Sequence, residues 1–265
     1  MKLITQNRSI QVLKLNNNGL GIQGGECIAQ ALLEAQALNK KQGKKSNLRV
    51  IQMGRNRLES AGAQHLTPAF EACAESLEEL RLYQNSIRPD VFPTLMPALA
   101  KCTLLTLLDL QDNTLTESGS IALAEALPSW KDLKTLNVGE CLLRPLGATA
   151  ILKGLTQGHP RLERLHLSFN EIDPLAANHI APMLHNKDRL VLLELNGNEF
   201  DPDGTQVACI LDILGVHGNT DALDELDEME YGDESSEEEE ETKDEDETKD
   251  EDLGEINAAI DALKV

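Results

Sequence analysis

The 265-residue sequence predicts an α/β solenoid, with a parallel sheet on its concave face and helices on its convex face. Three observations predict this architecture. One apolar pattern recurs seven times, the copies follow one another at nearly constant spacing, and a stretch rich in Ala and Leu with helical periodicity follows each copy. Self-similarity at a period of roughly 20 to 50 residues is the sequence signature of repeat proteins, in which each unit packs on its neighbours.

The recurring pattern is LxxLxLxxNxL, the consensus of a leucine-rich repeat. Six copies keep Asn at the polar position, and the fifth has Cys. The seven positions are Asn18, Asn56, Asn85, Asn113, Cys141, Asn170 and Asn198. They are spaced 38, 29, 28, 28, 29 and 28 residues apart, and we assign the additional residues of the first interval to the polar run at 39–47. A period of 28–29 leaves room for a full helix in each repeat, so we expect a leucine-rich repeat solenoid of the ribonuclease-inhibitor-like horseshoe type.

Each LxL triplet is predicted to form a short strand, whose leucines point inward while the residue between them points to the concave face. The Asn that follows is predicted to turn inward and to satisfy backbone groups, because a buried unpaired amide costs ~1–3 kcal/mol. Stacked copies then form an asparagine ladder, in which Cys141 replaces one side chain as a small buried residue. Helices are expected in stretches such as 119–127, 146–155 and 205–214, where Ala and Leu recur at helical spacing.

Charge divides the chain into three parts. Residues 1–220, the predicted repeat domain, carry 23 acidic and 21 basic residues. Residues 221–252 carry 20 acidic residues and two lysines, and we expect them to form a disordered acidic tail because they contain too little apolar surface to offset chain entropy. Residues 253–265 form a short C-terminal segment. At the other end, the sequence starts within a repeat without a polar capping unit, so we expect an N-terminally incomplete solenoid with a frayed first repeat, and a monomer once that edge is capped.

Composition and motifs exclude several functions. A nearly neutral repeat domain offers no surface for phosphates, which disfavours nucleic-acid binding. No apolar run is long enough to insert in a membrane, and no secretory signal follows Met1. The five scattered cysteines indicate a reducing compartment, and the six scattered histidines, expected at the surface or half-buried, do not have metal-ligand spacing. The P-loop, nucleophile-elbow and zinc-protease motifs are missing, so we expect neither a metal nor a cofactor.

The candidate binding surface is the polar edge of the predicted sheet. Between the two strand leucines stand Lys14, Gln52, Arg81, Asp109, Asn137, His166 and Glu194. Directly before the ladder positions stand Asn17, Arg55, Gln84, Asp112, Glu140, Phe169 and Gly197. This second row, the rim row, consists mainly of amides, acids and one Arg, which is typical of a surface that binds another protein.

Several loop segments resemble the Ran GTPase-activating protein family, in its fungal type. They are LKLNNNGLG (13–21), GRNRLE (54–59), QNSIRP (84–89), LDLQDNTLT (108–116), LHLSFNEI (165–172) and LLELNGNEF (192–200), followed by DELDEME (224–230) and the acidic run. The resemblance covers residues 10–252 and implies a protein that is not itself an enzyme but stimulates GTP hydrolysis by the small GTPase Ran. It also implies Ran in its GTP-bound form as the partner, with a Ran-binding protein as a further component. The implied location is the cytoplasm, including the cytoplasmic side of the nuclear envelope.

The resemblance implies a mechanism without an arginine finger, in which an asparagine on the repeat edge helps to order the catalytic glutamine of the GTPase. The matching segment is NNNG in the first repeat. Asn18 is the ladder residue by its spacing, so Asn17, one residue earlier and outward-facing, is the candidate catalytic contact. The candidate partner-binding residues are Asn16, Lys14, Arg55, Gln84, Asp112 and Glu140. Arg55 as an arginine finger is the alternative for the catalytic group.

Two other functions fit parts of the sequence. A leucine-rich, acidic-tailed histone chaperone would use the acidic run to capture basic partners. Chaperones of that type have short repeats without a full helix, whereas the spacing here is 28–29. A protein-binding scaffold without a GTPase partner is the third alternative, and only the loop resemblance distinguishes it from the first reading.

Overall fold

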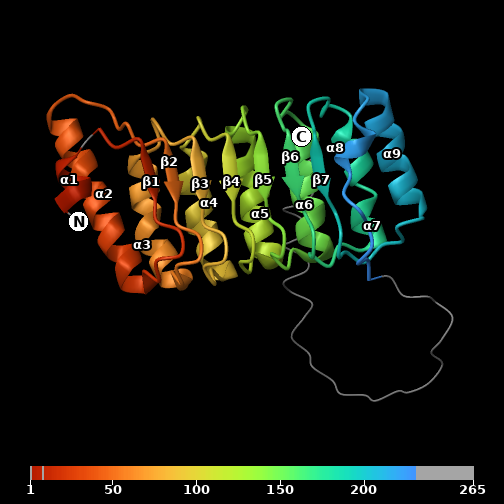
Figure 1. The fold of residues 1–265 in the computed structure, drawn as a ribbon, viewed down its shortest axis with the longest axis horizontal. Coiled ribbons are helices and arrows are strands. Elements are labelled where there is room, and N and C mark those ends of the chain that lie inside the picture. Colours follow the sequence, from red (N-terminus) through yellow and green to blue (C-terminus); the bar gives the residue numbers. More distant parts are fainter. Residues whose placement is uncertain (1, 8, 231–265) are drawn as a thin grey trace, which may run out of the picture.

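The computed structural model describes residues 2–7 and 9–230, which form a curved row of repeats (Figure 1). Seven strands form one parallel sheet in sequence order, β1 to β7. The strands are β1 (Val12–Lys14), β2 (Val50–Gln52), β3 (Glu79–Arg81), β4 (Leu107–Asp109), β5 (Thr135–Asn137), β6 (Arg164–His166) and β7 (Leu192–Glu194). Each strand overlaps an LxL triplet, as the repeat pattern predicts, and is centred on the first apolar residue of that triplet. The predicted leucine-rich repeat solenoid is therefore confirmed.

Helices cover the other face of the sheet (Figure 1). They are α1 (Lys2–Gln6), α2 (Gly21–Lys41), α3 (Glu59–Ala72), α4 (Phe92–Ala100), α5 (Thr116–Ala126), α6 (Arg144–Thr156), α7 (Pro174–Ala177), α8 (Ile180–Leu184) and α9 (Thr205–His217). Short 3-10 turns lie at η1 (Pro89–Val91), η2 (Leu127–Ser129) and η3 (Thr220–Ala222). The helices expected at 119–127, 146–155 and 205–214 correspond to α5, α6 and α9.

The core lies between the sheet and the helices. Residues at the centres of neighbouring strands are register partners, for example Leu80 with Leu108 and Leu108 with Leu136. These leucines are fully buried. Because every repeat places a branched aliphatic side chain at the same height, the core is a set of stacked aliphatic rows, which explains why few aromatic residues are needed.

The asparagine ladder is confirmed in the inner repeats. Asn113 Nδ2 donates to Leu82 O and Leu110 O, at 3.1 and 2.7 Å. Its Oδ1 accepts from Asn85 N and Ile87 N, at 3.2 and 3.0 Å. Each inner Asn thus satisfies backbone groups of its own repeat and of the preceding one. In the fifth repeat Cys141 Sγ contacts Leu110 O at 3.3 Å and is fully buried, as predicted for a small replacement.

Asn18 is the exception, and the prediction that it turns inward is wrong. Asn18 is exposed, and its Nδ2 donates to Asn16 O within the same loop at 3.0 Å. The reason is its position beside β1, the first strand of the sheet, where no described repeat offers backbone groups to its Oδ1. The backbone groups of the first repeat are hydrogen-bonded by Asn56 of the second repeat. Its Oδ1 accepts from Asn18 N at 3.0 Å, and its Nδ2 donates to Leu15 O at 2.8 Å.

The additional residues between Asn18 and Asn56 lie only partly in the polar run 39–47 to which the sequence assigned them. α2 has 21 residues and ends at Lys41, whereas α3 has 14. Much of the insertion therefore lengthens the helix, and only the remainder forms the loop assigned to 39–47. Ala, Leu, Gln and Lys around residues 31–41 are strong helix formers, so the helix continues beyond the end of the repeat consensus.

A second ladder, which we call the helix-end ladder, was not predicted. It consists of Cys102, Trp130, His159 and Lys187, each three residues before the first Leu of a repeat. Trp130 Nε1 donates to Leu99 O at 3.0 Å, and Lys187 Nζ donates to Gly158 O at 3.0 Å. His159 Nε2 lies 2.9 Å from Leu127 O, so this nitrogen carries the proton. Contrary to the expectation of surface or half-buried histidines, His159 is only 3 % exposed, and burial lowers its pKa. The ladder satisfies carbonyls that the helix ends leave unpaired.

The helix-end ladder predicts a pH-dependent stability. Lys187 is fully buried, and burial lowers the pKa of its ammonium group from 10.5 to about 8. Between these two values the unfolded chain holds a proton that the folded chain has released, so the free energy of unfolding rises as the pH increases through this window. Below about pH 8 Lys187 is charged in both the folded and the unfolded state, so the folded protein bears the full free-energy cost of burying the charge. We expect Lys187→Met to raise the free energy of unfolding at pH 7 by on the order of 2 kcal/mol. Urea unfolding of both proteins between pH 7 and 10.5 measures this, and a constant difference across that range would contradict the assignment.

The described chain continues past the predicted domain boundary at residue 220. Leu223 pairs in parallel with Leu193, and Asp224 accepts from Leu195 N at 2.8 Å and from Asn196 N at 3.1 Å. Glu230 N donates to Asn198 O at 2.8 Å. The expectation of a disordered tail from Asp221 is therefore wrong for residues 221–230, because Leu223, Leu226 and Met229 pack against the core and offset the acidic composition. The remainder of the predicted tail and the segment 253–265 lie outside the described residues.

Over residues 2–7 and 9–230, no helix is both long and apolar enough to cross a membrane.

Candidate protein-binding rim

The rim row is built by one backbone conformation repeated along the sheet. All seven residues have a positive φ, between 51° and 68°, in the left-handed region. Their backbone amides extend the sheet ladder beyond the strands: Asn17 N donates to Gly54 O at 2.9 Å, Arg55 N to Tyr83 O at 2.9 Å and Gln84 N to Gln111 O at 2.7 Å. The row therefore continues the strand spacing of about 4.8 Å per repeat.

The left-handed conformation determines which residue types fit the rim row at a low cost in conformational free energy. This conformation costs a non-glycine residue about 1–2 kcal/mol, and the cost is lowest for Asn because its short amide hydrogen-bonds locally. Asn17 is therefore well suited to its position. Arg55, Gln84 and Glu140 are held in the left-handed conformation by the hydrogen bonds that their backbone amides donate to the next repeat. Most of the rim side chains are exposed. The result is a rigid row of polar groups on a fixed backbone.

Asn17 is held by its backbone, and its side chain is free to bind. Its amide group makes no hydrogen bond with any residue of the described chain, and the residue is exposed. The neighbouring asparagines differ. Asn16 Oδ1 accepts from Gly54 N at 2.8 Å, so the predicted partner-binding residue Asn16 uses its oxygen within the solenoid. Of the three consecutive asparagines, Asn17 alone presents an exposed amide that makes no hydrogen bond within the described chain.

Arg55 and Gln84, both predicted to bind the partner, contact each other. Arg55 Nε donates to Gln84 Oε1, which directs the guanidinium along the rim toward the third repeat. Lys14 is exposed at the end of β1, beside this basic and neutral part of the rim. Three to four repeats further on, the rim becomes acidic at Asp112 and Glu140, and Gln111 Nε2 donates to Glu140 Oε1 at 2.7 Å. The structure thus places the predicted site residues on one edge, over about 19 Å from Asn17 to Glu140.

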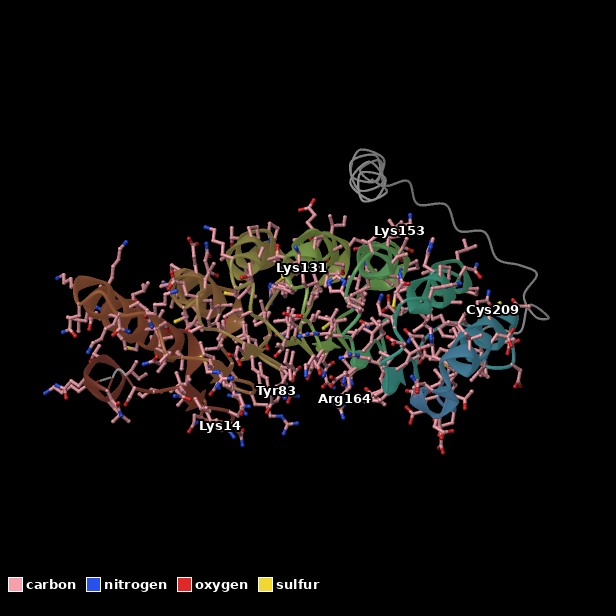
Figure 2. All side chains as sticks on the ribbon, turned by 90° about the horizontal axis from the view of Figure 1, so that it is seen from above. Lys14, Tyr83, Lys131, Lys153, Arg164 and Cys209 are labelled. Carbon is pink, nitrogen blue, oxygen red and sulfur yellow. The ribbon has the colours of Figure 1, made fainter. Side chains whose placement is uncertain are left out.

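Titratable side chains on the concave face pair with one another. Arg81 Nη1 lies 3.2 Å from Asp109 Oδ2, and His166 Nδ1 lies 2.6 Å from Glu194 Oε2. Asp109 is only 5 % exposed, and burial raises the pKa of its carboxyl, while the hydrogen bond from Gln111 N and the charge of Arg81 oppose the rise. Figure 2 shows Lys14, Tyr83 and Arg164 on this side, and Lys131 and Lys153 on the helix side.

An aromatic ring that sequence reasoning missed shapes the rim next to Asn17. The ring of Tyr83 lies against Gly54, where an added Cβ would stand 2.3 Å from a ring carbon. Gly54 supplies both the carbonyl that accepts from Asn17 N and the amide that donates to Asn16 Oδ1. Phe169 covers Gly197 in the same way near the other end of the sheet. The signal for such a contact is a Gly shortly after a strand, with an aromatic residue at the same position of a neighbouring repeat.

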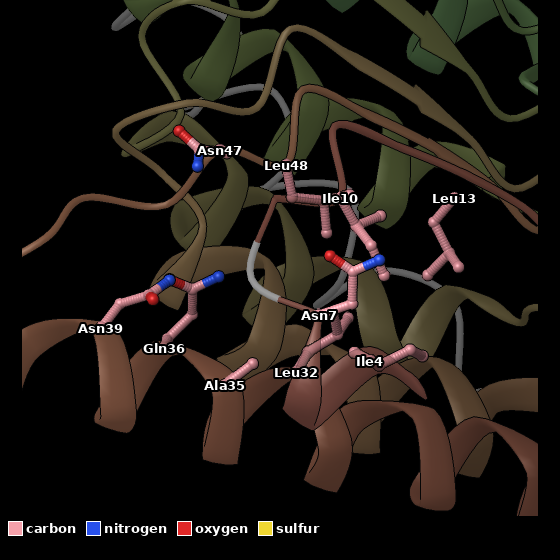
Figure 3. A pocket seen from close by; sticks show the side chains of 10 residues that line it. All are labelled: Ile4, Asn7, Ile10, Leu13, Leu32, Ala35, Gln36, Asn39, Asn47 and Leu48. Carbon is pink, nitrogen blue, oxygen red and sulfur yellow. The ribbon is translucent and has the colours of Figure 1, made fainter. Parts of the chain in front are cut away.

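A small cavity lies at the other edge of the first repeat, between α1, α2 and the start of β1 (Figure 3). It is lined mainly by aliphatic side chains, including Ile4, Ile10, Leu13 and Leu32. Its volume is 20 Å³, which is enough for about one water molecule. α1 packs beside α2 at this edge, and Leu13 and Leu15 are half-buried. In residues 2–7 and 9–230, no group of three or more His, Cys, Asp or Glu side chains is placed to hold a metal ion.

Comparisons with known proteins agree with the fold. The Leucine Rich repeat family model matches residues 6–29 and 101–124. Ran GTPase-activating protein 1 of Saccharomyces cerevisiae is 40% identical over 201 residues, which are 74% of this chain and 49% of the relative. Ran GTPase-activating protein of Drosophila melanogaster is 34% identical over 75% of this chain and 33% of the relative. Ribonuclease inhibitor of Sus scrofa is 27% identical over 76% of this chain and 42% of the inhibitor. The chain therefore spans about half or less of the length of these relatives.

Proposed function

We propose that this chain, a leucine-rich repeat relative of the Ran GTPase-activating proteins, stimulates GTP hydrolysis by Ran. The observation that carries the proposal is the combination of 40% identity over 201 residues with an exposed, unengaged amide at Asn17 on the rim. The partner is Ran in its GTP-bound form, with a Ran-binding protein as a further component. In this proposal the chemistry takes place in the active site of the partner.

Asn17 is the group that we propose to act on the GTPase. Small GTPases hydrolyse GTP slowly, and their activators raise the rate by up to ~10⁵-fold, in part by positioning the glutamine that orients the attacking water. A neutral amide donates and accepts hydrogen bonds at once, so it can hold a glutamine amide in one orientation. The rigid backbone at Asn17 means that this contact loses little conformational freedom when it forms.

Arg55 is assigned to docking rather than to catalysis. An arginine finger has to extend into the partner's active site, whereas Arg55 is engaged with Gln84 on the rim. With Lys14 it gives the first repeats a positive charge, and Asp112 and Glu140 give the fourth and fifth a negative one. This division of charge favours one orientation of a partner whose charges are complementary.

The histone-chaperone alternative is not favoured. It requires short repeats without full helices, whereas helices α3 to α6 contain 14, 9, 11 and 13 residues. We propose a cytoplasmic location, including the cytoplasmic side of the nuclear envelope. The five cysteines, which are all free thiols in the structure, support a reducing compartment.

Phosphate release tests the proposal. GTP-loaded Ran is mixed with substoichiometric amounts of the chain, and a second small GTPase, Ras, serves as the specificity control. We expect faster release from Ran and an unchanged rate from Ras. If Ran kept its intrinsic rate while the chain still bound it, the chain would be a scaffold. An unchanged Ran rate together with capture of histones would favour the chaperone alternative.

A further inference from the structure

The backbone of Asn17 is held by one glycine of the second repeat. Gly54 O accepts from Asn17 N at 2.9 Å, and Gly54 N donates to the neighbouring Asn16 Oδ1 at 2.8 Å. The same carbonyl accepts from the ladder residue Asn56, whose Nδ2 lies at 3.1 Å. The place from which the Asn17 side chain projects therefore depends on where the peptide units of Gly54 lie.

The ring of Tyr83, from the third repeat, occupies the space that a side chain at Gly54 would need. A Cβ added at Gly54 would stand 2.3, 2.4 and 2.6 Å from Cε1, Cζ and Cδ1 of the ring. These separations are far below the roughly 3.5–4.0 Å of a van der Waals contact between carbon atoms. Tyr83 follows β3 by two residues and lies on the same side of the molecule as Lys14 (Figure 2). The ring thus covers the peptide units that hold Asn17.

The backbone of Tyr83 is fixed, whereas its hydroxyl group has no partner in the described chain. Tyr83 O accepts from Arg55 N at 2.9 Å and from Asn85 Nδ2 at 3.3 Å. Asn85 is fully buried in the asparagine ladder, so this anchor belongs to the core. The phenol oxygen makes no hydrogen bond with any residue of 2–7 or 9–230. The contribution of Tyr83 to the rim is therefore the ring itself.

The fifth repeat has the same backbone contact without a covering ring. Gly139 O accepts from Asp112 N at 3.1 Å, as Gly54 O accepts from Asn17 N. A Cβ added at Gly139 would meet no listed neighbour closer than 3.5 Å, which is an ordinary contact distance. A rim residue can therefore bond to the next repeat without an aromatic ring above the bond. The fold of a repeat does not require the ring at Gly54.

We propose that Tyr83 is a positioning residue, which holds the peptide units of Gly54 and through them the amide of Asn17. This role rests on the function proposed above and deepens it. The ring lies where the strands have ended, so it limits the opening of the bond between Asn17 N and Gly54 O. A misplacement of about 1 Å at a group that acts in a transition state lowers the rate strongly, so loss of the ring affects the rate more than the affinity.

Four variants separate the ring from the hydroxyl and from the glycine. Tyr83→Ala removes the ring, and Tyr83→Phe keeps it. Gly54→Ala displaces the ring while leaving it in the chain, because the added Cβ would overlap it. Gly139→Ala is the matched control, since its added Cβ has room. Neither glycine has a positive φ, so alanine adds no left-handed strain at either position.

Amide exchange of the chain alone measures the positioning without Ran. We expect Tyr83→Ala and Gly54→Ala each to speed exchange of the Asn17 amide proton about tenfold, and the double variant to speed it no further, because both changes break one contact. Tyr83→Phe and Gly139→Ala should exchange as the wild type does. Unchanged exchange at Asn17 in Tyr83→Ala would overturn the proposal. Equally faster exchange throughout β5 would also overturn it, because the ring would then stabilise the whole solenoid.

Single-turnover hydrolysis and a binding titration on GTP-loaded Ran measure the consequence. At saturating protein we expect Tyr83→Ala and Gly54→Ala to lower the rate about tenfold while the affinity changes by no more than a few fold. Tyr83→Phe and Gly139→Ala should keep the wild-type rate. In an Asn17→Gly background, Tyr83→Ala should have no further effect on the rate.

Three results would contradict the role of Tyr83. A loss in Tyr83→Phe as large as in Tyr83→Ala would make the hydroxyl a direct contact with the partner. A loss of affinity alone would make the ring part of the docking surface, and a further loss of rate in the Asn17→Gly background would separate the ring from Asn17. If the wild-type chain did not stimulate Ran, the proposed function would fail, and the exchange at Asn17 would still decide whether Tyr83 positions it.

Discussion

Asn17→Ala is expected to lower the rate of GTP hydrolysis on Ran by about 10²- to 10³-fold, while the affinity for GTP-loaded Ran changes by no more than a few fold. The loss follows from removing a positioned hydrogen-bonding group that acts in the transition state. Asn17 is exposed and makes no side-chain hydrogen bond within the described chain, so its removal leaves no buried group unpaired. Single-turnover hydrolysis at saturating protein and a separate binding titration measure the two effects.

Two control variants isolate the amide of Asn17. Because φ at Asn17 is 59°, Ala at this position adds about 1 kcal/mol of backbone strain. Asn17→Gly removes the same amide without that strain, and it should lose as much activity as Asn17→Ala while keeping the wild-type stability. Arg55→Ala should weaken binding and leave the rate at saturation nearly unchanged. If Arg55→Ala abolished hydrolysis while Asn17→Gly did not change it, an arginine finger would replace the asparagine mechanism.

The second large effect concerns stability. Asn113→Ala should lower the free energy of unfolding by roughly 3 kcal/mol, because it leaves two buried amides, Asn85 N and Ile87 N, without an acceptor and removes one of the donors to the buried carbonyls of Leu82 and Leu110. Asn18→Ala, at the same position of the first repeat, should change it by about 0.5 kcal/mol or less, because Asn18 is exposed. Urea unfolding measures both. Similar losses in the two variants would show that Asn18 has buried partners and would contradict its assignment to the surface.

Much of the fold could be predicted from the sequence because each repeat obeys one local rule. The LxL triplets determine where strands form, and the constant period of 28–29 determines that a helix follows each. The failures occur where this rule ends. Asn18 carries the consensus but lies on the first repeat, and Leu223 departs from the consensus yet pairs with Leu193. A repeat pattern describes a unit surrounded by neighbours, so it does not predict the units at an edge.

The helix-end ladder shows a second limit. Cys102, Trp130, His159 and Lys187 share a function but no chemical class, because each needs only one donor at the right height. A consensus built on residue type misses such a position. The candidate site, too, could be predicted only in part. The rim row could be identified from its place before the ladder residues, but the contact between Arg55 and Gln84 and the use of Asn16 Oδ1 by Gly54 depend on neighbours brought together by the solenoid.

The central claim is that Asn17 acts through the catalytic glutamine of Ran, and a double-mutant cycle across the two proteins tests it most directly. Single-turnover rates are measured for both forms of the chain, wild type and Asn17→Gly, with Ran that keeps its catalytic glutamine and with Ran in which this glutamine is replaced by alanine. Interacting residues give non-additive effects in such a cycle. We predict that Asn17→Gly lowers the rate about 10²-fold or more with unmodified Ran and has almost no effect once the glutamine is absent. An equal loss with both forms of Ran would contradict the account.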